Sequence, residues 1–249
     1  MTALDSAESV GVLLRQWRLR RRLSQLDLAT ASGISTRHLS FIETGRSRPT
    51  NTMIVRLAEH LDVPLRERNA LLLAGGYAPV YPRRELAGPD LGAVLAAFRQ
   101  LLDAHRPYPA LLVNRWWELI ESNAGIDMFT VDVAPQLLEP PLNVLRLCLH
   151  PNGMAPRIAN LAECKGRLLA RLRRQADLSG DHRLVELHRE LRSYPGGDAV
   201  VRPTGADVVV PLRYRHHGRE LAFFSVTSTV GSPLDVTVAE LAMESFFPA

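Results

Sequence analysis

The hydrophobic positions of the first 75 residues repeat at the spacing of short amphipathic helices. Apolar residues recur at i, i+3, i+4 and i+7 over residues 10–17, which predicts a first helix. Ser24 and Ser35 each precede a hydrophobic run in the position of an N-cap, and apolar residues one before and four after each cap can form a staple. Gly33 lies between these two helices and permits the positive φ of a sharp turn. The pattern therefore predicts two short, separately capped helices around a glycine turn, which is a helix-turn-helix.

Two further helices complete this segment. Thr50 or Asn51 caps a fourth helix, and Pro64 opens a fifth that a pair of glycines ends. We therefore predict an N-terminal all-α domain of five helices at residues 1–78. Proline and glycine are frequent over residues 79–90, which predicts a linker.

The pattern changes beyond the linker, where short apolar runs alternate with amphipathic segments. A helix is predicted over 90–104. The other expected elements are strands at 110–113, 116–121, 208–214 and 220–230, and helices at 122–130, 142–149, 156–175 and 181–193. Residues 91–249 are therefore expected to form an α+β domain with an antiparallel sheet covered by helices. A hydrophobic pocket between sheet and helices is a natural ligand site in such a domain.

The end of the chain carries two conflicting signals. Thr237 and Glu240 form a capping-box pattern, so we favour a terminal helix within 235–247. Valines alternate at 236 and 238, which leaves an edge strand open as the alternative.

The net charge of +4 is concentrated in the predicted helical domain. Residues 1–75 contain eleven arginines against seven acidic residues, so the rest of the chain holds equal numbers of basic and acidic residues. Basic charge gathered in one small domain is typical of proteins that bind a polyanion such as nucleic acid.

Other features argue against an enzyme, a metal site or a membrane protein. No apolar run approaches the roughly 20 residues that span a bilayer, and charges interrupt the start of the chain, so we expect a cytoplasmic protein without a signal peptide. Cys148 and Cys164 fit no zinc spacing and are interpreted as ordinary thiols. His216 and His217 fall in a predicted turn, where solvation is favoured over metal binding. Nucleotide, zinc-protease and serine-hydrolase motifs are missing, so no catalytic residue, cofactor or metal is expected.

The residues around the predicted turn form a distinctive run: Ser24-Gln25-Leu26, Gly33-Ile34-Ser35 and Leu39-Ser40-Phe41-Ile42-Glu43-Thr44-Gly45-Arg46-Ser47-Arg48-Pro49. Over about residues 10–75 the chain thus resembles the Xre family, the Cro and phage-repressor type of DNA-binding domain. The resemblance implies binding of double-stranded DNA, with the second helix of the motif in the major groove. It also implies a buried structural role for Glu43. Operator sequence does not transfer, because Thr36 and Phe41 stand where phage repressors often carry longer amides.

The resemblance assigns DNA contacts to a set of polar and basic residues: Gln25, Ser35, Thr36, Arg37, His38, Ser40, Phe41, Arg46, Ser47 and Arg48. Gln25 would contact the DNA backbone, and the residues from 46 to 48 would grip phosphate. Arg37 is our choice of base reader, because a guanidinium pairs bidentately with guanine. Two alternatives stay open: Arg37 as a solvated helix residue, and Phe41 as a core residue.

A second run carries another resemblance: Asn114-Arg115-Trp116-Trp117-Glu118, residues 141–151, residues 155–163, Val210-Pro211-Leu212-Arg213 and residues 244–249. These segments resemble the MmyB-like ligand-binding domain, which occurs behind Xre-type domains and has a PAS-like fold. Long-chain fatty acid binding is associated with that family. The resemblance therefore implies a lipid or another apolar ligand that bears a carboxylate.

Such a ligand needs an apolar sleeve and a charged anchor. The expected sleeve is Trp116, Met128, Leu145, Leu149, Met154, Ile158, Phe223 and Phe224. His150, Arg157 and Asn160 form the expected anchor, with Arg157 as a bidentate clamp for the carboxylate. The alternative is that the apolar set is ordinary core and that the three polar residues form structural hydrogen bonds.

These features together predict a bacterial one-component transcriptional regulator that senses a small apolar ligand, with a fatty acid or similar molecule as effector. We expect a homodimer on a near-palindromic operator, because two recognition helices one DNA turn apart increase specificity. The alternative is a constitutive DNA-binding or antitoxin-type protein whose C-terminal domain binds a protein partner. An enzyme carrying a DNA-binding module would need a catalytic cluster, which the sequence does not offer.

Overall fold

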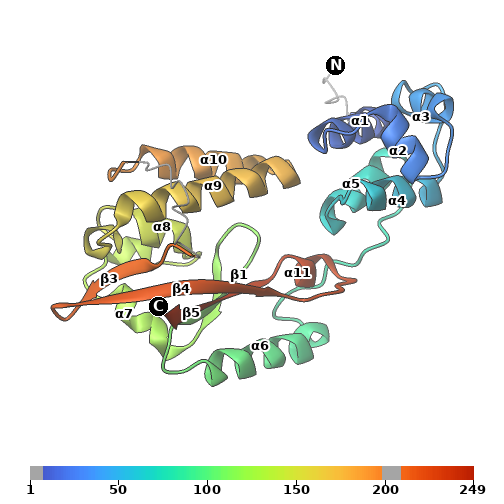
Figure 1. Ribbon diagram of the computed structural model, residues 1–249. Helices are drawn as coiled ribbons and strands as arrows, with labels where there is room; N and C mark the ends of the chain where they lie inside the picture. Colours follow the sequence, from blue (N-terminus) through green and yellow to red (C-terminus); the bar gives the residue numbers. More distant parts are fainter. Residues whose placement is uncertain (1–7, 198–208) are drawn as a thin grey trace, which may run out of the picture. The chain divides into compact units, whose positions relative to one another are not determined.

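The computed structural model describes residues 8–197 and 209–249, and Figure 1 shows its helices and strands. The chain divides into two compact units, and the division falls after Arg83, within the stretch 79–90. Each unit has its own hydrophobic core.

The first unit is helical in all its regular elements between residues 8 and 83. The helices are α1 (Val10–Arg20), α2 (Gln25–Ala31), α3 (Thr36–Glu43), α4 (Asn51–His60) and α5 (Leu65–Ala74). The predicted caps are confirmed: the Ser24 side chain accepts from the backbone N–H of Asp27, whose carboxylate accepts from the N–H of Ser24. The side chains of Ser35 and Thr50 each accept from the backbone N–H three residues on and so cap α3 and α4. Leucines and isoleucines from all five helices meet in one core.

A buried ion pair links α1 to α3. Nε and Nη2 of Arg18 donate to the two carboxylate oxygens of Glu43 at 2.7 and 2.8 Å. The side chains are 8% and 1% exposed. Nη1 of Arg18 also donates to the carbonyl of Leu23, directly before α2. The pair therefore fixes the two helices on either side of α2, and the buried structural role expected for Glu43 is confirmed.

The second unit is built on one antiparallel sheet of five strands, counted over the described residues. The strands are β1 (Ala110–Val113), β2 (Leu119–Ser122), β3 (Leu212–His216), β4 (Arg219–Thr229) and β5 (Ala242–Pro248). Their order across the sheet is β2-β1-β5-β4-β3. This arrangement, with helices on the sheet, confirms the predicted α+β class.

Helices cover both faces of this sheet (Figure 1). α6 (Gly92–Ala104) packs its apolar face against β1 and β5. The opposite face carries α7 (Asp127–Thr130), α8 (Val144–Leu149), α9 (Leu161–Ser179) and α10 (His182–Ser193). The remaining short elements are α11 (Val236–Ala239) and the 3₁₀ turns Pro89–Leu91, Ala124–Ile126, Pro135–Leu137 and Ala155–Arg157. The face that α8 and α9 cover is the one that carries the pocket described below.

The terminal helix favoured for the end of the chain was wrong beyond a single turn, and the alternative was right about a strand but wrong about its position at an edge. The capping-box pattern yields only the single turn of α11, and residues 242–248 form strand β5. This strand is central, since β1 pairs with it on one side and β4 on the other. Its residues Met243, Glu244 and Ser245 are buried because the sheet is covered on both faces, so tertiary packing outweighs the local helix signal.

The second predicted strand also begins later than expected. Residues 114–118 form a turn in which Trp117 has φ 65°, and β2 starts only at Leu119. The side-chain oxygen of Asn114 accepts from the N–H groups of Trp116 and Glu118, which is the local bonding that favours a turn over a strand. Arg115, which is almost fully buried, holds this turn through ion pairs to Asp181 (3.1 Å) and Glu240 (2.8 Å).

One predicted helix is displaced along the chain and ends at Ser179, and another is broken. The helix expected over 156–175 begins at Leu161, because Pro156 lies in a 3₁₀ turn and Ile158 forms a β-bridge with Tyr214. The helix expected over 122–130 splits into a 3₁₀ turn and the single turn of α7. The strand expected over 208–214 begins at Leu212 in the structure, and its first expected position, Val208, lies outside the described residues.

Candidate nucleic-acid interface and ligand pocket

The outer side of α3 carries the side chains predicted to face DNA. Leu39, Ile42 and Glu43 turn inward and are buried. Arg37 is exposed, while Thr36, Ser40 and Phe41 are half-buried on the helix. The outward row therefore presents short hydroxyl groups, an aromatic ring and a long cation.

Phe41 lies beneath two guanidinium groups. The guanidinium carbon of Arg37 is 5.3 Å from the centre of the Phe41 ring, and that of Arg46 is 6.0 Å away. Cation–π attraction at such distances orients an exposed guanidinium without removing its hydrogen-bond donors. Phe41 is not part of the helical core cluster, so its ring supports the cationic row instead of packing inside the unit.

The other residues predicted to contact DNA differ in whether their polar groups already make hydrogen bonds within the protein. Gln25 donates its amide to Glu43 at 2.8 Å, and Arg48 donates to the carbonyl of Gly75 at 3.2 Å. The Ser35 hydroxyl accepts from the backbone N–H of His38 as the cap of α3. Ser47 is half-buried, and Arg46 is exposed directly after the helix. The structure thus places all of these residues on or beside α3, with Arg37 and Arg46 as its exposed cations over Phe41.

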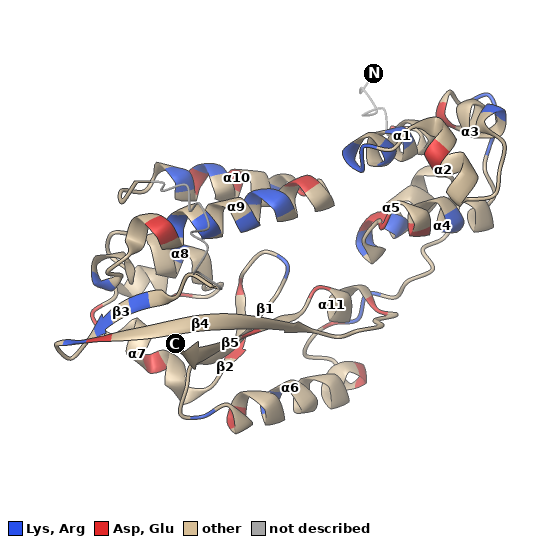
Figure 2. Cartoon of the chain, viewed as in Figure 1, with Lys and Arg blue, Asp and Glu red and all other residues tan. Residues whose placement is uncertain are grey.

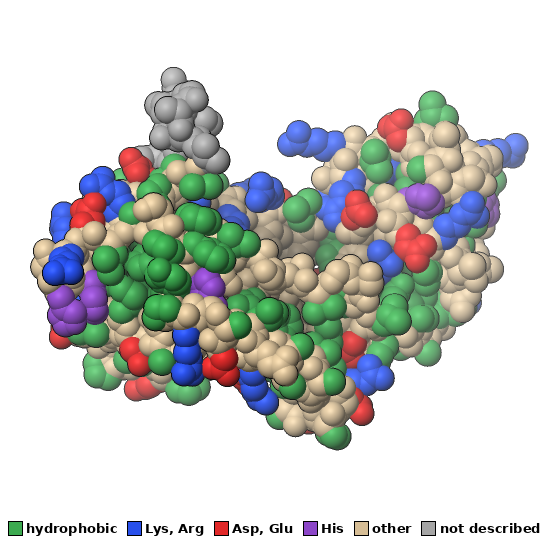
Figure 3. Space-filling view, turned by 60° about the horizontal axis from the view of Figure 1, so that its bottom comes forward, with side chains coloured by type: hydrophobic (Ala, Val, Ile, Leu, Met, Phe, Trp, Pro, Cys, Tyr) green, Lys and Arg blue, Asp and Glu red, His purple; other side chains and the backbone are tan. Residues whose placement is uncertain are grey.

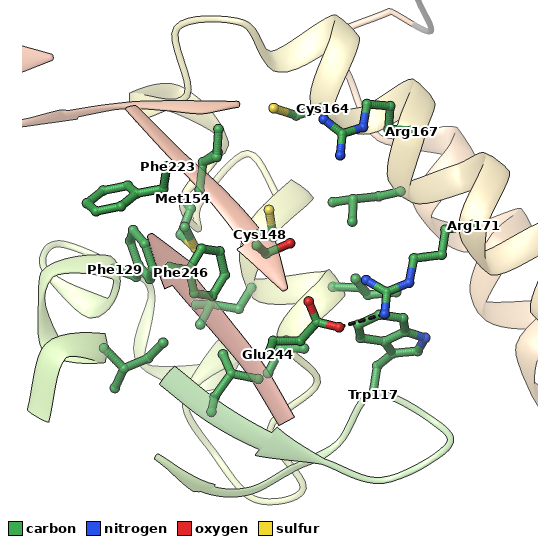
Figure 4. Close-up of a pocket in the computed structure, with 18 of the residues that line it drawn as sticks. Trp117, Phe129, Cys148, Met154, Cys164, Arg167, Arg171, Phe223, Glu244 and Phe246 are labelled. Atoms are coloured by element: carbon green, nitrogen blue, oxygen red, sulfur yellow. Dashed lines mark hydrogen bonds and ion pairs between the residues drawn. The ribbon is translucent and has the colours of Figure 1, made fainter. Parts of the chain in front are cut away.

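The second unit contains a cavity of about 440 Å³ between the sheet and its helices (Figure 4). Its walls are mostly apolar: Leu111, Trp117, Leu119, Ile126, Phe129, Leu142, Val144, Leu145, Leu147, Cys148, Met154, Cys164, Leu168, Ala170, Val210, Leu212, Phe223 and Phe246. Its polar lining is Thr130, Arg167, Arg171, Arg174, Ser225 and Glu244. A volume of this size lies in the range of sites that hold small organic ligands.

Arginines of α9 provide the positive charge of the pocket. Arg167, Arg171 and Arg174 stand at i, i+4 and i+7, so they share one face of the helix. Blue segments along α9 mark its basic residues in Figure 2. Arg167 donates to the backbone carbonyl of Val210. Arg174 is exposed and makes no ion pair within residues 8–197 and 209–249.

Arg171 is the arginine that is tied into the pocket wall. Its Nη2 donates to Oε1 of Glu244 at 2.6 Å and to the hydroxyl of Thr227 at 2.9 Å. Its guanidinium carbon lies 4.5 Å from the centre of the Trp117 ring. Figure 4 shows Arg171 reaching from α9 toward Glu244 on β5, with Trp117 beside it.

Both cysteines line this pocket as neutral thiols. Burial raises the pKa of Cys148 to about 12 and that of Cys164 to about 11. A thiol with such a pKa is almost entirely protonated near neutral pH and is a poor nucleophile and a poor metal ligand. The two side chains therefore add apolar surface to the cavity.

We expect both thiols to react slowly with iodoacetamide near neutral pH in the folded protein. The rate should rise as the pH approaches the two raised pKa values, because only the thiolate attacks. Mass spectrometry of the alkylated chain after timed reaction measures this, with the urea-unfolded protein as the control for ordinary cysteine reactivity. Rapid labelling of the folded chain at neutral pH would contradict the burial of these groups.

Of the residues expected to bind ligand, Leu145, Met154 and Phe223 line the cavity. Leu149 and Ile158 are fully packed core residues, and Met128 packs against the core beside them. Trp116 directs its indole N–H to Asp181 at 2.8 Å. These four residues do not line the pocket.

Phe224 faces the other side of the sheet, where it stacks on Phe247 with ring centres 5.5 Å apart. Both rings are half-buried. In the space-filling view, apolar side chains form a patch on the second unit (Figure 3). Neighbouring residues of a strand point to opposite faces, so Phe223 and Phe224 could not both line one pocket.

The structure does not bring the expected carboxylate anchor to the pocket. Arg157 donates to the hydroxyl of Tyr214 at 3.2 Å and to the carbonyl of Val131. Asn160 bonds the backbone of Pro211 and Arg213 at the start of β3, and the ring of His150 packs edge-on against Tyr194. All three side chains are engaged in structural contacts outside the lining of the cavity.

The charged groups that do line the cavity were missed in the sequence. Arginines at 167, 171 and 174 repeat at helical spacing beside apolar residues of the same helix, and this repeat is the signal that indicates them. Glu244 has a weaker signal, as a lone carboxylate in an otherwise apolar run near the chain end. Its position on the central strand depends on the pairing of β5, which local sequence does not predict.

Comparison with protein-family models returns two matches. The model of the MmyB-like transcription regulator ligand binding domain matches residues 94–249, which is more than half of the chain. The chain belongs to this family. A helix-turn-helix model matches residues 14–68 of the same MmyB-like regulator, the segment that contains α2 and α3.

Curated relatives agree with the helix-turn-helix match. Uncharacterized HTH-type transcriptional regulators of Mycobacterium bovis and of two strains of Mycobacterium tuberculosis are each 28% identical over 174 residues, covering 68% of this chain and 68% of the relative. This MmyB-like protein is therefore a transcriptional regulator with a helix-turn-helix DNA-binding domain and a ligand-binding domain. Within the described residues, no helix combines the length and apolar character needed to cross a bilayer.

Proposed function

We propose that this MmyB-like regulator binds operator DNA through α3 and that an anionic amphiphile, such as a fatty acid, occupies the cavity of the second unit and changes DNA affinity. The observation that carries the proposal is the cavity of about 440 Å³, apolar over most of its wall and lined by arginines on α9. An acyl chain fits such a wall because burying its methylene groups removes apolar surface from water. A carboxylate at the arginines gains charge-assisted hydrogen bonds, which are stronger than neutral ones.

On DNA, Arg37 acts as base reader and Arg46 as phosphate contact, since both are exposed cations at α3. Gln25 and Arg48 contribute through the donors that their internal hydrogen bonds leave available. A pair of chains binds a near-palindromic operator, because one short helix covers few base pairs and a second copy doubles the contacts. The protein exchanges between an arrangement that can bind DNA and one that cannot. A ligand shifts the populations of the two arrangements only if it binds them with different affinities.

We expect the gently purified protein to retain a lipid and to gain thermal stability with fatty acids from lauric to stearic. Native mass spectrometry detects the first effect, and a thermal melt of the delipidated chain detects the second. A ligand that binds only the folded protein raises its stability by mass action.

Two tryptophan variants provide a matched comparison. Leu168→Trp narrows the cavity from a half-buried position on α9, so it should abolish retention and the thermal shift. Leu178→Trp, at an exposed position of the same helix, should preserve both. A wild-type chain that retains no lipid and melts at the same temperature with every acid would contradict the proposal. That result would favour a constitutive DNA-binding protein whose second unit binds a protein partner.

A further inference from the structure

Glu244 is a charged residue in an otherwise apolar position. It lies in the middle of β5, between Leu111 of β1 and Thr227 of β4, and its side chain is only 6% exposed. It is the one carboxylate among the described residues that line the cavity. A buried carboxylate is unfavourable unless a cation and hydrogen-bond donors compensate it.

The compensating groups of Glu244 are Arg171 and Thr227, and Arg171 belongs to the part of the cavity wall where the head group of a ligand would bind. Oε1 of Glu244 accepts from Arg171 at 2.6 Å and from the hydroxyl of Thr227 at 2.8 Å. The Thr227 hydroxyl in turn accepts from Nη2 of Arg171, so the three groups form a closed triangle. Arg171 is thus already bound to an anion that belongs to the protein.

Arg171 has a second support that does not depend on Glu244. Its guanidinium lies over the ring of Trp117, and the indole N–H of Trp117 donates to Gln175 at 2.9 Å. Trp117 has φ 65°, a backbone conformation that a bulky residue keeps only when its surroundings fix it. The ring therefore holds Arg171 at the cavity whether or not the pair with Glu244 is intact.

We propose that Glu244 is a specificity-determining residue that sets how strongly the pocket prefers an anionic head group over a neutral one. A carboxylate bound at Arg171 competes with Glu244 for the same donors and is repelled by its charge. A neutral hydroxyl head group is not repelled and does not need to displace Glu244. The internal carboxylate therefore lowers affinity for acids selectively and leaves affinity for alcohols of the same chain length unchanged.

The other charges around this position agree with that role. Arg167 and Arg174 come from the same face of α9, so an acid that Glu244 excludes from Arg171 still meets positive charge. An acid that took the place of Glu244 at Arg171 would also break the ion pair that joins α9 to the central strand β5. This inference rests on the proposed binding of an anionic amphiphile, and it adds which residue opposes that binding.

The test compares palmitic acid with hexadecanol on the delipidated full-length chain. Glu244→Gln replaces the carboxylate by a neutral amide of nearly the same shape, whose oxygen can still accept from the Thr227 hydroxyl. We expect palmitic acid to bind this variant about tenfold more tightly than the wild type, with hexadecanol affinity unchanged. Glu121→Gln is the matched control, since Glu121 pairs with Arg99 and does not line the cavity. It should leave both affinities at the wild-type values.

Each outcome decides between the two proposals. Unchanged or weaker palmitic acid binding by Glu244→Gln, while the wild type binds palmitic acid, overturns the role of Glu244 and leaves the proposed ligand class intact. An equal gain for acid and alcohol also overturns it, because charge would then not be the cause. A wild-type chain that binds neither compound overturns the proposed function and this inference with it.

Discussion

Replacement of Glu43 by alanine lowers the free energy of unfolding of the helix-turn-helix unit by about 3–5 kcal/mol. The substitution leaves the Arg18 guanidinium, whose side chain is 8% exposed, without its bidentate partner. It also removes the acceptor of the Gln25 amide at the start of α2. Urea unfolding of the full chain, followed through the amide signals of the first unit, measures the change.

A double variant provides the control for this effect. Arg18→Met combined with Glu43→Leu replaces the pair by apolar groups, so it should recover most of the lost stability. If Glu43→Ala lowered the free energy of unfolding by less than about 1 kcal/mol, the account would be contradicted, because an ion pair exposed to solvent contributes that little.

The same pair also predicts a pH dependence. Burial alone would raise the pKa of Glu43, but hydrogen bonds from Arg18 and Gln25 and the charge of Arg18 outweigh it, so the pKa is lowered from its ordinary value of 4.5. A carboxyl group with a lowered pKa in the folded state stabilises the fold above its unfolded pKa. Stability of this unit should therefore be constant near neutral pH and fall as the pH drops below about 4.5. In the Arg18→Met, Glu43→Leu variant that acid loss should be smaller.

The second large effect concerns DNA. Arg37→Ala should weaken specific operator binding by about 1–3 kcal/mol, the value of one good bidentate base contact. Arg37 is exposed on α3 and makes no core contact, so the fold should be intact. Fluorescence anisotropy on an operator selected from random duplexes measures the loss.

Arg46→Ala separates base reading from phosphate contact. A phosphate contact weakens binding to all sequences alike and lowers the slope of affinity against salt by about one. Arg37→Ala should instead reduce the preference for the operator over random DNA. Unchanged operator affinity of a folded Arg37→Ala protein would remove this residue from the reading helix.

The helical unit follows from its sequence because its determinants are local. A cap such as Ser24 bonds a residue three positions away, and the turn depends on the freedom of Gly33 to adopt φ 62°. Such signals are complete within a few residues. The beginnings of the helices were therefore predicted to within a residue, whereas the buried role of Glu43 was implied by the family resemblance.

The second unit is less predictable because its determinants are distant in sequence. β5 owes its place to partners more than 100 positions away in β1. The local pattern of residues 235–247 carries both helix and strand signals, and only this pairing decides between them.

The pocket shows the same limit at the level of single residues. Arg157 and Asn160 looked like ligand groups because they are polar residues in a specific motif, yet they bond Tyr214 within β3 and the backbone at the start of that strand. No motif of the sequence singles out Arg171, yet it meets Glu244 across 73 positions of sequence. Which polar groups converge on a cavity depends on register and crossing geometry, which a one-dimensional pattern does not contain.

The measurement that tests the central claim most directly is operator affinity of the delipidated full chain with and without saturating palmitic acid. We predict a change of at least about fivefold, the lower end of common coupling between two sites. Leu168→Trp, which cannot take up the acid, should show no change. An operator affinity that is the same with and without palmitic acid, while the wild-type chain demonstrably binds it, would contradict the account.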